Sequence, residues 1–398
     1  MNIKKSKKQI GVGGLILSNH EKKLVNEVLN SNQLSYGSKT RRFEKMFSKI
    51  HQVKYSIFMN SGTSALHLAL TTLKYKYNWQ DQDEVLVPAV TFVATSNIVL
   101  HNNLIPIFVE VESHTYNIDP DKIEERITKK TKAIIVVHLL GLPASMSKIL
   151  KIAKKYNLKI IEDSAECMFA KYKNKSVGSF GDIGCFSTYI AHYLVTGIGG
   201  FAITNNINLA TNLRSLMNHG RDVIYTSSTD DSNLNKKQLE KVVKKRFNFV
   251  KIGHSMRCTE MESALGIGQL QRHKETIKRR KQIANIYLSE FSKYQDRMQL
   301  PTTPDDRDHT YMLFGLVLRK ENKRKIVNYL EKYNIETRDL LPLINQPIYK
   351  KLYGNLEKFY PVAKWINKSG FYIGCHPFLS DNDLDYVVNI FKKFFKEN

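Results

Sequence analysis

Two short stretches of the sequence combine apolar runs with side chains that could carry protons or bind anions. Asp163 ends the apolar stretch Ile160-Ile161-Glu162, and Ser187 and His192 follow Cys185-Phe186, shortly before a pair of glycines. An imidazole transfers protons near neutral pH, and a hydroxyl can donate to an anion. A histidine cannot form the imine that a lysine amine forms with an aldehyde. The imidazole predicts proton transfer, although a packed or solvent-facing role stays the alternative for any one of 12 histidines.

A third stretch, Asn60-Ser61-Gly62-Thr63-Ser64, has the composition of a helix start. Small residues expose backbone amides there, and the hydroxyls of Thr63 and Ser64 add donors, so a phosphate could dock at the helix N-terminus. The alternative is a helix cap without a ligand. We therefore take Gly62, Thr63 and Ser64 as candidate phosphate contacts.

These stretches need elements that bring them together, and the hydrophobic pattern indicates which ones. Apolar runs alternate with helix-like segments, which is the pattern of a parallel sheet covered by helices on both faces. We predict helices over 65–73 and 146–156, a long charged helix after residue 271, and a polar excursion or mobile lid over 221–245. The predicted strands are 57–60, 84–88, 106–111, 133–137, 159–162 and 201–204. A chain of 398 residues is also long enough for two domains.

The composition narrows the class of protein. The formal net charge is +24, but the lysines are spread over the whole chain without a nucleic-acid motif, so we expect no nucleic-acid partner. The four cysteines lack paired spacing, which predicts buried, reduced thiols and no metal site. No apolar run is long enough to cross a bilayer, and no signal-type apolar core follows the lysine-rich start. We therefore expect a cytoplasmic protein without a membrane partner.

Taken together, these motifs resemble the DegT/DnrJ/EryC1/StrS sugar aminotransferases, a fold-type I pyridoxal phosphate family. The similarity is carried by Ser187 followed by Thr196-Gly197-Ile198-Gly199-Gly200, and it extends over nearly the whole chain, to segments such as Gly374-Cys375-His376-Pro377. It implies an aspartate aminotransferase-like α/β fold. A large, doubly wound mixed-sheet domain would span 1–250, with the mobile excursion near 221–245, and a smaller α+β domain would span 251–398. The expected cofactor is pyridoxal 5'-phosphate or pyridoxamine 5'-phosphate.

The resemblance also assigns expected roles to the candidate residues. Ser187 and the turn at Gly62, Thr63 and Ser64 would contact the cofactor phosphate. Phe92 in Val87-Pro88-Ala89-Val90-Thr91-Phe92-Val93-Ala94-Thr95 would stack on the pyridine ring, and Asp163 would keep the ring nitrogen protonated. Read alone, Phe92 could be a core residue and Asp163 a cap.

Three positions depart from the family pattern. Glu166 stands where Gln or His is usual among the aminotransferases. Ser255, in Gly253-His254-Ser255-Met256-Arg257, replaces an Asn that reaches the cofactor phosphate of the neighbouring subunit. His192 stands where the family has the lysine that tethers the cofactor. If the family pattern holds, the protein is a homodimer with shared active sites.

Histidine in place of that lysine distinguishes the sugar 3-dehydratases, and the chain resembles those that act on GDP-4-keto-6-deoxymannose. The branch with an iron–sulfur cluster is disfavoured, because residues 221–246 contain no cysteine. The resemblance implies a lyase of deoxysugar biosynthesis for surface polysaccharide, such as the O-antigen of lipopolysaccharide. Glutamate would convert the cofactor to its amine form. His192 would be the general base, Asp163 would hold the protonated pyridine, and His219 would help the C3 hydroxyl of a nucleotide-linked sugar to leave.

Three other functions stay open at this point. The chain could be an aminotransferase for a 4-keto or 3-keto sugar that uses another lysine, for instance Lys171, Lys173 or Lys175. It could also be a cofactor-binding homologue without turnover, or a basic nucleic-acid module. The pattern identifies neither the nucleotide nor the hexose.

Overall fold

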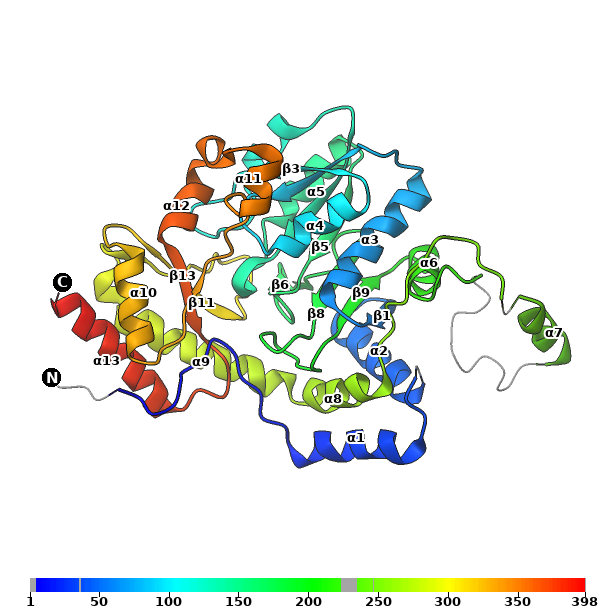
Figure 1. The fold of residues 1–398 in the computed structure, drawn as a ribbon, viewed down its shortest axis with the longest axis horizontal. Coiled ribbons are helices and arrows are strands. Elements are labelled where there is room, and N and C mark those ends of the chain that lie inside the picture. Colours follow the sequence, from blue (N-terminus) through cyan, green and yellow to red (C-terminus); the bar gives the residue numbers. More distant parts are fainter. Residues whose placement is uncertain (1–4, 36, 223–234, 246, 398) are drawn as a thin grey trace.

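The computed structural model describes residues 5–35, 37–222, 235–245 and 247–397 (Figure 1). A seven-stranded sheet forms the centre of the larger part, in the order β1-β9-β8-β5-β4-β2-β3. Within this sheet β9 runs antiparallel to both neighbours, while the other pairs are parallel. The strands are β1 (Tyr55–Met59), β2 (Glu84–Pro88), β3 (Ile105–Val109), β4 (Thr131–Val137), β5 (Lys159–Asp163), β8 (Ile183–Ser187) and β9 (Gly200–Thr204).

Apolar side chains are buried on both faces of this sheet. On β4, Ile134 and Val136 pack in one cluster with helix α5, whereas Ile135 and Val137 pack on the opposite side with helix α3. This two-sided burial explains why the strands have continuous apolar runs and not an alternating pattern. The helices of this part are α1 (Asn19–Ser31), α2 (Ser38–Ile50), α3 (Gly62–Tyr77), α4 (Val93–His101), α5 (Met146–Lys155), α6 (Ile207–Met217), α7 (Lys236–Lys245) and α8 (Glu260–Gln271).

A second, smaller unit follows in the chain and packs beside the large sheet (Figure 1). Its antiparallel sheet has the order β10-β11-β13-β12, and a separate aromatic core includes Tyr287, Phe314 and Phe391. Its elements are α9 (His273–Phe291), β10 (Met298–Gln299), β11 (Leu313–Leu318), α10 (Lys323–Lys332), β12 (Arg338–Asp339), α11 (Pro347–Tyr353), α12 (Pro361–Ser369), β13 (Gly370–Gly374) and α13 (Asp381–Glu397). The α/β fold with a large mixed sheet is thereby confirmed.

The predicted elements are found with small shifts at their ends. The strand expected over 106–111 is β3, which ends two residues earlier, and the helix expected over 65–73 is the longer α3. Of the excursion expected over 221–245, residues 223–234 lie outside the described residues, while residues 236–245 form helix α7. All four cysteines are free and buried, as expected.

Two segments lie across the expected division at residue 250. Helix α8 packs against α1 and α2, and its Ile267 belongs to the core of the large sheet. In the other direction, Ile10 belongs to the core of the smaller unit and pairs with Ile335. We therefore propose that the larger domain includes α8 and that the smaller one includes the segment around Ile10. No helix in the described ranges is both long and apolar enough to cross a membrane.

Candidate active site

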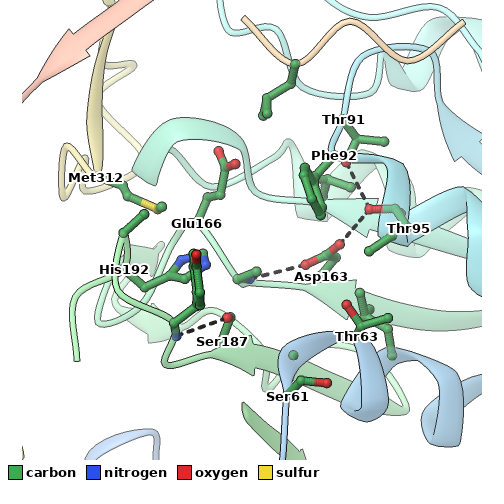
Figure 2. Close-up of a pocket in the computed structure, with 18 of the residues that line it drawn as sticks. Ser61, Thr63, Thr91, Phe92, Thr95, Asp163, Glu166, Ser187, His192 and Met312 are labelled. Atoms are coloured by element: carbon green, nitrogen blue, oxygen red, sulfur yellow. Dashed lines mark hydrogen bonds between the residues drawn. The ribbon is translucent and has the colours of Figure 1, made fainter. Parts of the chain in front are cut away.

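A cavity of about 450 Å³ lies where the two units meet, at the carboxyl ends of β2, β5 and β8 (Figure 2). Open α/β sheets place ligands at this edge, because the loops that follow parallel strands converge there. The smaller unit closes the cavity with Met312, Leu341 and Tyr372, and the N-terminal segment adds Val12. Seven of the residues predicted from the sequence line it, namely Gly62, Thr63, Phe92, Asp163, Glu166, Ser187 and His192.

The start of α3 and the end of β8 approach each other closely at one wall. Ser61 caps the helix, since its hydroxyl accepts from the backbone N–H of Ser64 at 3.0 Å. A Cβ atom on Gly62 would lie 2.8 Å from Cβ of Ser187, and one on Gly200 would lie 2.4 Å from the backbone nitrogen of Gly62. Glycine at both positions lets the Ser187 hydroxyl lie beside the helix N-terminus. Amides, hydroxyls and the helix dipole are thus gathered as a phosphate site requires.

Asp163 ends β5 and points into the cavity (Figure 2). One carboxylate oxygen accepts a hydrogen bond from the Thr95 hydroxyl at 2.8 Å, and the other accepts from the backbone N–H of Ala165 at 3.2 Å. Burial raises the pKa of Asp163, and the two hydrogen bonds oppose that rise because they favour the anion. The Thr95 oxygen is itself 2.9 Å from the Thr91 hydroxyl, so a chain of two threonines supports the carboxylate.

A second buried carboxylate, Glu162, holds the end of β5 from the other face. It accepts from the backbone N–H groups of Gly178, Phe180 and Gly181 at 2.6 to 2.7 Å, and from Nε2 of His138 at 3.0 Å. Nδ1 of that histidine accepts from a backbone N–H at 3.0 Å, so the proton of the neutral ring is on Nε2. Glu162 is therefore a structural anchor that ties the glycine-rich loop to the strand carrying Asp163.

Glu166 lies on the opposite side of the cavity from the phosphate wall (Figure 2). Its Oε2 accepts from the backbone N–H of Leu140 at 2.9 Å. Burial raises the pKa of Glu166 to about 7, the Leu140 hydrogen bond opposes this, and the nearby charge of Asp163 adds to it. The carboxyl group therefore exchanges a proton near neutral pH.

His192 lies in the loop between β8 and β9 and lines the same cavity (Figure 2). Its Nδ1 is buried without a hydrogen-bond partner among the described residues. Burial lowers the pKa of His192 to about 4, a hydrogen bond to the backbone of Ala165 opposes this, and the positive charge of Arg280 lowers it further. The imidazole is therefore neutral at pH 7 and can accept a proton.

Three predicted residues are not among those that line the cavity. The Ser64 hydroxyl donates within the turn, to Asn60 Oδ1 at 2.6 Å. His219 and Ser255 are both exposed and lie side by side in another part of the chain, where the residues around them pair as Asn218 with Ser255. The structure therefore does not bring His219 to the cavity of its own chain, and a role for Ser255 requires another subunit.

Several lining residues were not predicted from the sequence. Thr95 and Ser61 belong to motifs that were recognised, and the four-residue spacing of Thr91 and Thr95 at a helix start could have indicated their pairing. Tyr372 and Met312 come from distant segments without a comparable signal.

No lysine or arginine is among the described residues that line the cavity. The alternative lysines lie elsewhere, exposed on the β6 (Lys171–Tyr172) and β7 (Lys175–Ser176) hairpin. No three histidine, cysteine or acidic side chains of the described ranges form a group suited to a metal ion.

Comparisons with known proteins agree with this geometry. The model of the DegT/DnrJ/EryC1/StrS aminotransferase family matches residues 16–392. The chain is 33% identical to a dTDP-3-amino-3,6-dideoxy-alpha-D-galactopyranose transaminase of Aneurinibacillus thermoaerophilus, over 93% of this chain and 94% of that protein. It is 25% identical to an E. coli GDP-4-keto-6-deoxy-D-mannose-3-dehydratase with bound hydrated PLP, with a TM-score of 0.86 over 96% of this chain and 99% of that one. A further 3-dehydratase structure, with a trapped PLP-glutamate geminal diamine, is 26% identical with a TM-score of 0.85 and covers 95% of this chain and 99% of that one.

Proposed function

Because the chain belongs to the DegT/DnrJ/EryC1/StrS aminotransferase family, we propose that it is a pyridoxal phosphate-dependent 3-dehydratase of nucleotide-linked 4-keto-6-deoxyhexoses. The observation that carries this proposal is His192, which lines the cavity where the aminotransferases have a lysine. A histidine can move protons but cannot hold the cofactor covalently. We place the activity in deoxysugar biosynthesis for surface polysaccharide.

The side chains of the cavity fit the cofactor that the family uses. The Ser187 hydroxyl and the N-terminus of α3 at Gly62 and Thr63 would hold its phosphate, and Asp163 would meet its ring nitrogen. Phe92 has 58% of its surface exposed at the cavity, which leaves its ring free to stack on a planar ligand. When bound, pyridoxamine phosphate supplies an amine that condenses with a ketone and a protonated ring that accepts electrons.

The residues around this site divide the proton transfers between them. Asp163, held as an anion by Thr95 and Ala165, would keep the proton on the ring nitrogen. His192 is neutral at pH 7 and would remove a proton as general base. The C3 hydroxyl must gain a proton to leave as water. Glu166, with its pKa near 7 and its place in the cavity, is better placed for this step than the exposed His219.

We further propose a homodimer in which the loop around Ser255 completes the partner's site. The support is that Ser255 is exposed away from its own cavity, and that Ile252 beside it has 83% of its surface exposed, an unusual place for a large apolar side chain. No cation lines the cavity among the described residues, so a second chain could also supply one. Light scattering of the purified protein would measure its mass in solution.

We also propose a cytoplasmic location, which four free cysteines favour.

The test is to incubate the protein with pyridoxal phosphate, glutamate and GDP-4-keto-6-deoxymannose, and to identify the sugar product by mass spectrometry. Loss of the C3 oxygen with release of ammonia is the expected result, and the His192→Ala variant should lose it. A dTDP-linked 4-keto-6-deoxyhexose serves as a second substrate, because the sequence does not identify which nucleotide carries the sugar.

An amino sugar as the product would overturn the proposal in favour of transamination. So would a lysine found linked to the cofactor after borohydride reduction and peptide mapping. Unchanged substrates, with no absorbance change of the cofactor on adding glutamate, would indicate a homologue without turnover.

A further inference from the structure

Arg280, on helix α9, is a buried cation without a carboxylate partner among the described residues. Only 2% of its surface is exposed. Its neighbours in the same basic run are different, since Arg279 pairs with Asp381 at 2.8 Å and Lys281 pairs with Asp308. Burying a charge without a counter-ion is unfavourable for folding unless hydrogen bonds compensate for it. The hydrogen bonds of the guanidinium must therefore compensate for the buried charge of Arg280.

The two terminal nitrogens of the guanidinium donate hydrogen bonds to backbone carbonyl groups, while Nε is buried without a hydrogen-bond partner among the described residues. Nη1 donates to Met312 O at 2.7 Å and to Cys375 O at 3.0 Å, with a longer contact to Tyr311 O at 3.3 Å. Nη2 donates to His192 O at 3.4 Å. These carbonyls belong to the segments before β11 and after β13 of the smaller unit, and to the loop between β8 and β9 of the larger one. One side chain thus joins the backbone of His192 to the smaller unit.

The residue after His192 strengthens the same connection. The ring centroid of Tyr193 lies 4.8 Å from the guanidinium carbon, within the range of a cation–π contact. Its hydroxyl donates to Glu166 O at 3.1 Å and lies 2.7 Å from the Thr310 hydroxyl. The loop is therefore held at the carbonyl of His192 and at the residue that follows, which fixes where the imidazole enters the cavity.

We propose that Arg280 is a positioning residue for His192, because it ties the backbone of that loop to the smaller unit and places a fixed positive charge beside the imidazole. The charge acts on the imidazole through space, since Arg280 is not among the residues that line the cavity. A cation beside a histidine disfavours the imidazolium and so adds to the effect of burial, which already favours the neutral ring that accepts a proton. The value of that form for catalysis depends on the proposed dehydratase function, whereas the effect on titration does not.

Burial is the larger cause of the lowered pKa of His192, and the charge of Arg280 adds to it. The other titratable or charged groups beside the ring come from the β5 segment, the β8–β9 loop, β13 and the junction of α8 and α9. They are Asp163, Glu166, Tyr189, Tyr193, Tyr372 and Arg272. Glu166 is uncharged near pH 4, because its pKa is about 7, so it does not offset the charge of Arg280 in the range where His192 titrates. Removing Arg280 should therefore raise the pKa of His192.

The test uses the full-length protein, without substrate, labelled with ¹³C in its histidine rings. The signal of His192 is assigned by its loss in His192→Asn and is followed by NMR from about pH 2.5 to 8, a range that contains the whole transition of a group with a pKa of about 4. In Arg280→Met the pKa of His192 should rise by about half a unit or more. In Arg280→Lys, which keeps the charge but not the planar fork, it should stay near its original value. Arg279→Gln changes the adjacent, half-buried arginine that pairs with Asp381, and as the matched control it should leave the titration of His192 unchanged.

Hydrogen exchange measures the positioning separately. Amides of residues 189–196 should exchange about tenfold faster in Arg280→Lys, because the single ammonium nitrogen of a lysine cannot reach all the carbonyls that the two separate nitrogens Nη1 and Nη2 bind. A folded Arg280→Met with an unchanged His192 titration would overturn the electrostatic effect. Unchanged hydrogen exchange in Arg280→Lys would overturn the positioning role. If Arg280→Met does not fold, the exchange result for Arg280→Lys alone tests the proposal. Neither readout needs turnover, so both can succeed where the dehydratase assay fails.

Discussion

Replacing Thr95 by valine removes one hydrogen bond from Asp163 while keeping the shape of the side chain. Thr95 is fully buried, and its hydroxyl donates to the carboxylate at 2.8 Å. A hydrogen bond to a charged group contributes about 1.5–3 kcal/mol. Without it the pKa of Asp163 rises further, because this hydrogen bond lowers it. The carboxylate then holds a protonated ring nitrogen less well. At 1.4 kcal/mol per factor of ten, the cofactor should bind about 10- to 100-fold more weakly.

Thr91→Val is the graded control for this experiment. Its hydroxyl is 2.9 Å from the Thr95 oxygen and touches the carboxylate only through it, so a loss of about threefold or less is expected. Absorbance titrations with pyridoxal phosphate and fluorescence titrations with pyridoxamine phosphate measure the two affinities, and urea unfolding of the cofactor-free protein checks stability. The reasoning fails if Thr95→Val binds within about twofold of the wild type, or if Thr91→Val loses as much.

Two further predictions concern the other buried carboxyl groups. Glu162→Gln should lower the free energy of unfolding by about 3 kcal/mol, because an amide NH2 would face backbone donors that now meet a carboxylate. The control is Glu84→Gln near the edge of the sheet, which should lower it by less than about 1 kcal/mol. Urea unfolding measures both. The pKa of Glu166 is raised from 4.5 to about 7, so its contribution to stability is full below pH 4.5 and is lost as the pH rises through 7. The wild type should therefore lose up to about 3 kcal/mol relative to Glu166→Gln between pH 4.5 and 8, since 2.5 units at 1.36 kcal/mol per unit set the bound. A pH-independent difference between the two proteins would contradict this account.

The strands of the large sheet and the site residues that directly follow them could be predicted, because both depend on the hydrophobic pattern of short stretches of sequence. Continuous apolar runs such as β4 arise from burial on both faces, and Asp163 and Ser187 stand directly where such runs end. Residues such as Tyr372 could not be predicted, because they reach the cavity only through the packing of the smaller unit. Arg280 shows the same limit, since it is one of four consecutive basic residues and only the fold distinguishes it from the other three, which are half-buried or exposed.

The path of the N-terminal segment has a consequence for the synthesis of the protein. Val12 lines the cavity, and its backbone N–H donates to Glu336 at 2.8 Å across a separation of 324 residues. At about 5–20 residues per second, a ribosome takes roughly 20–60 s to make the intervening chain. All seven strands of the large sheet leave the ribosome within that time, before Glu336, which binds the backbone of Val12, has been made. Nascent chains stalled ahead of residue 336 should therefore contain a folded sheet around a site that is still open.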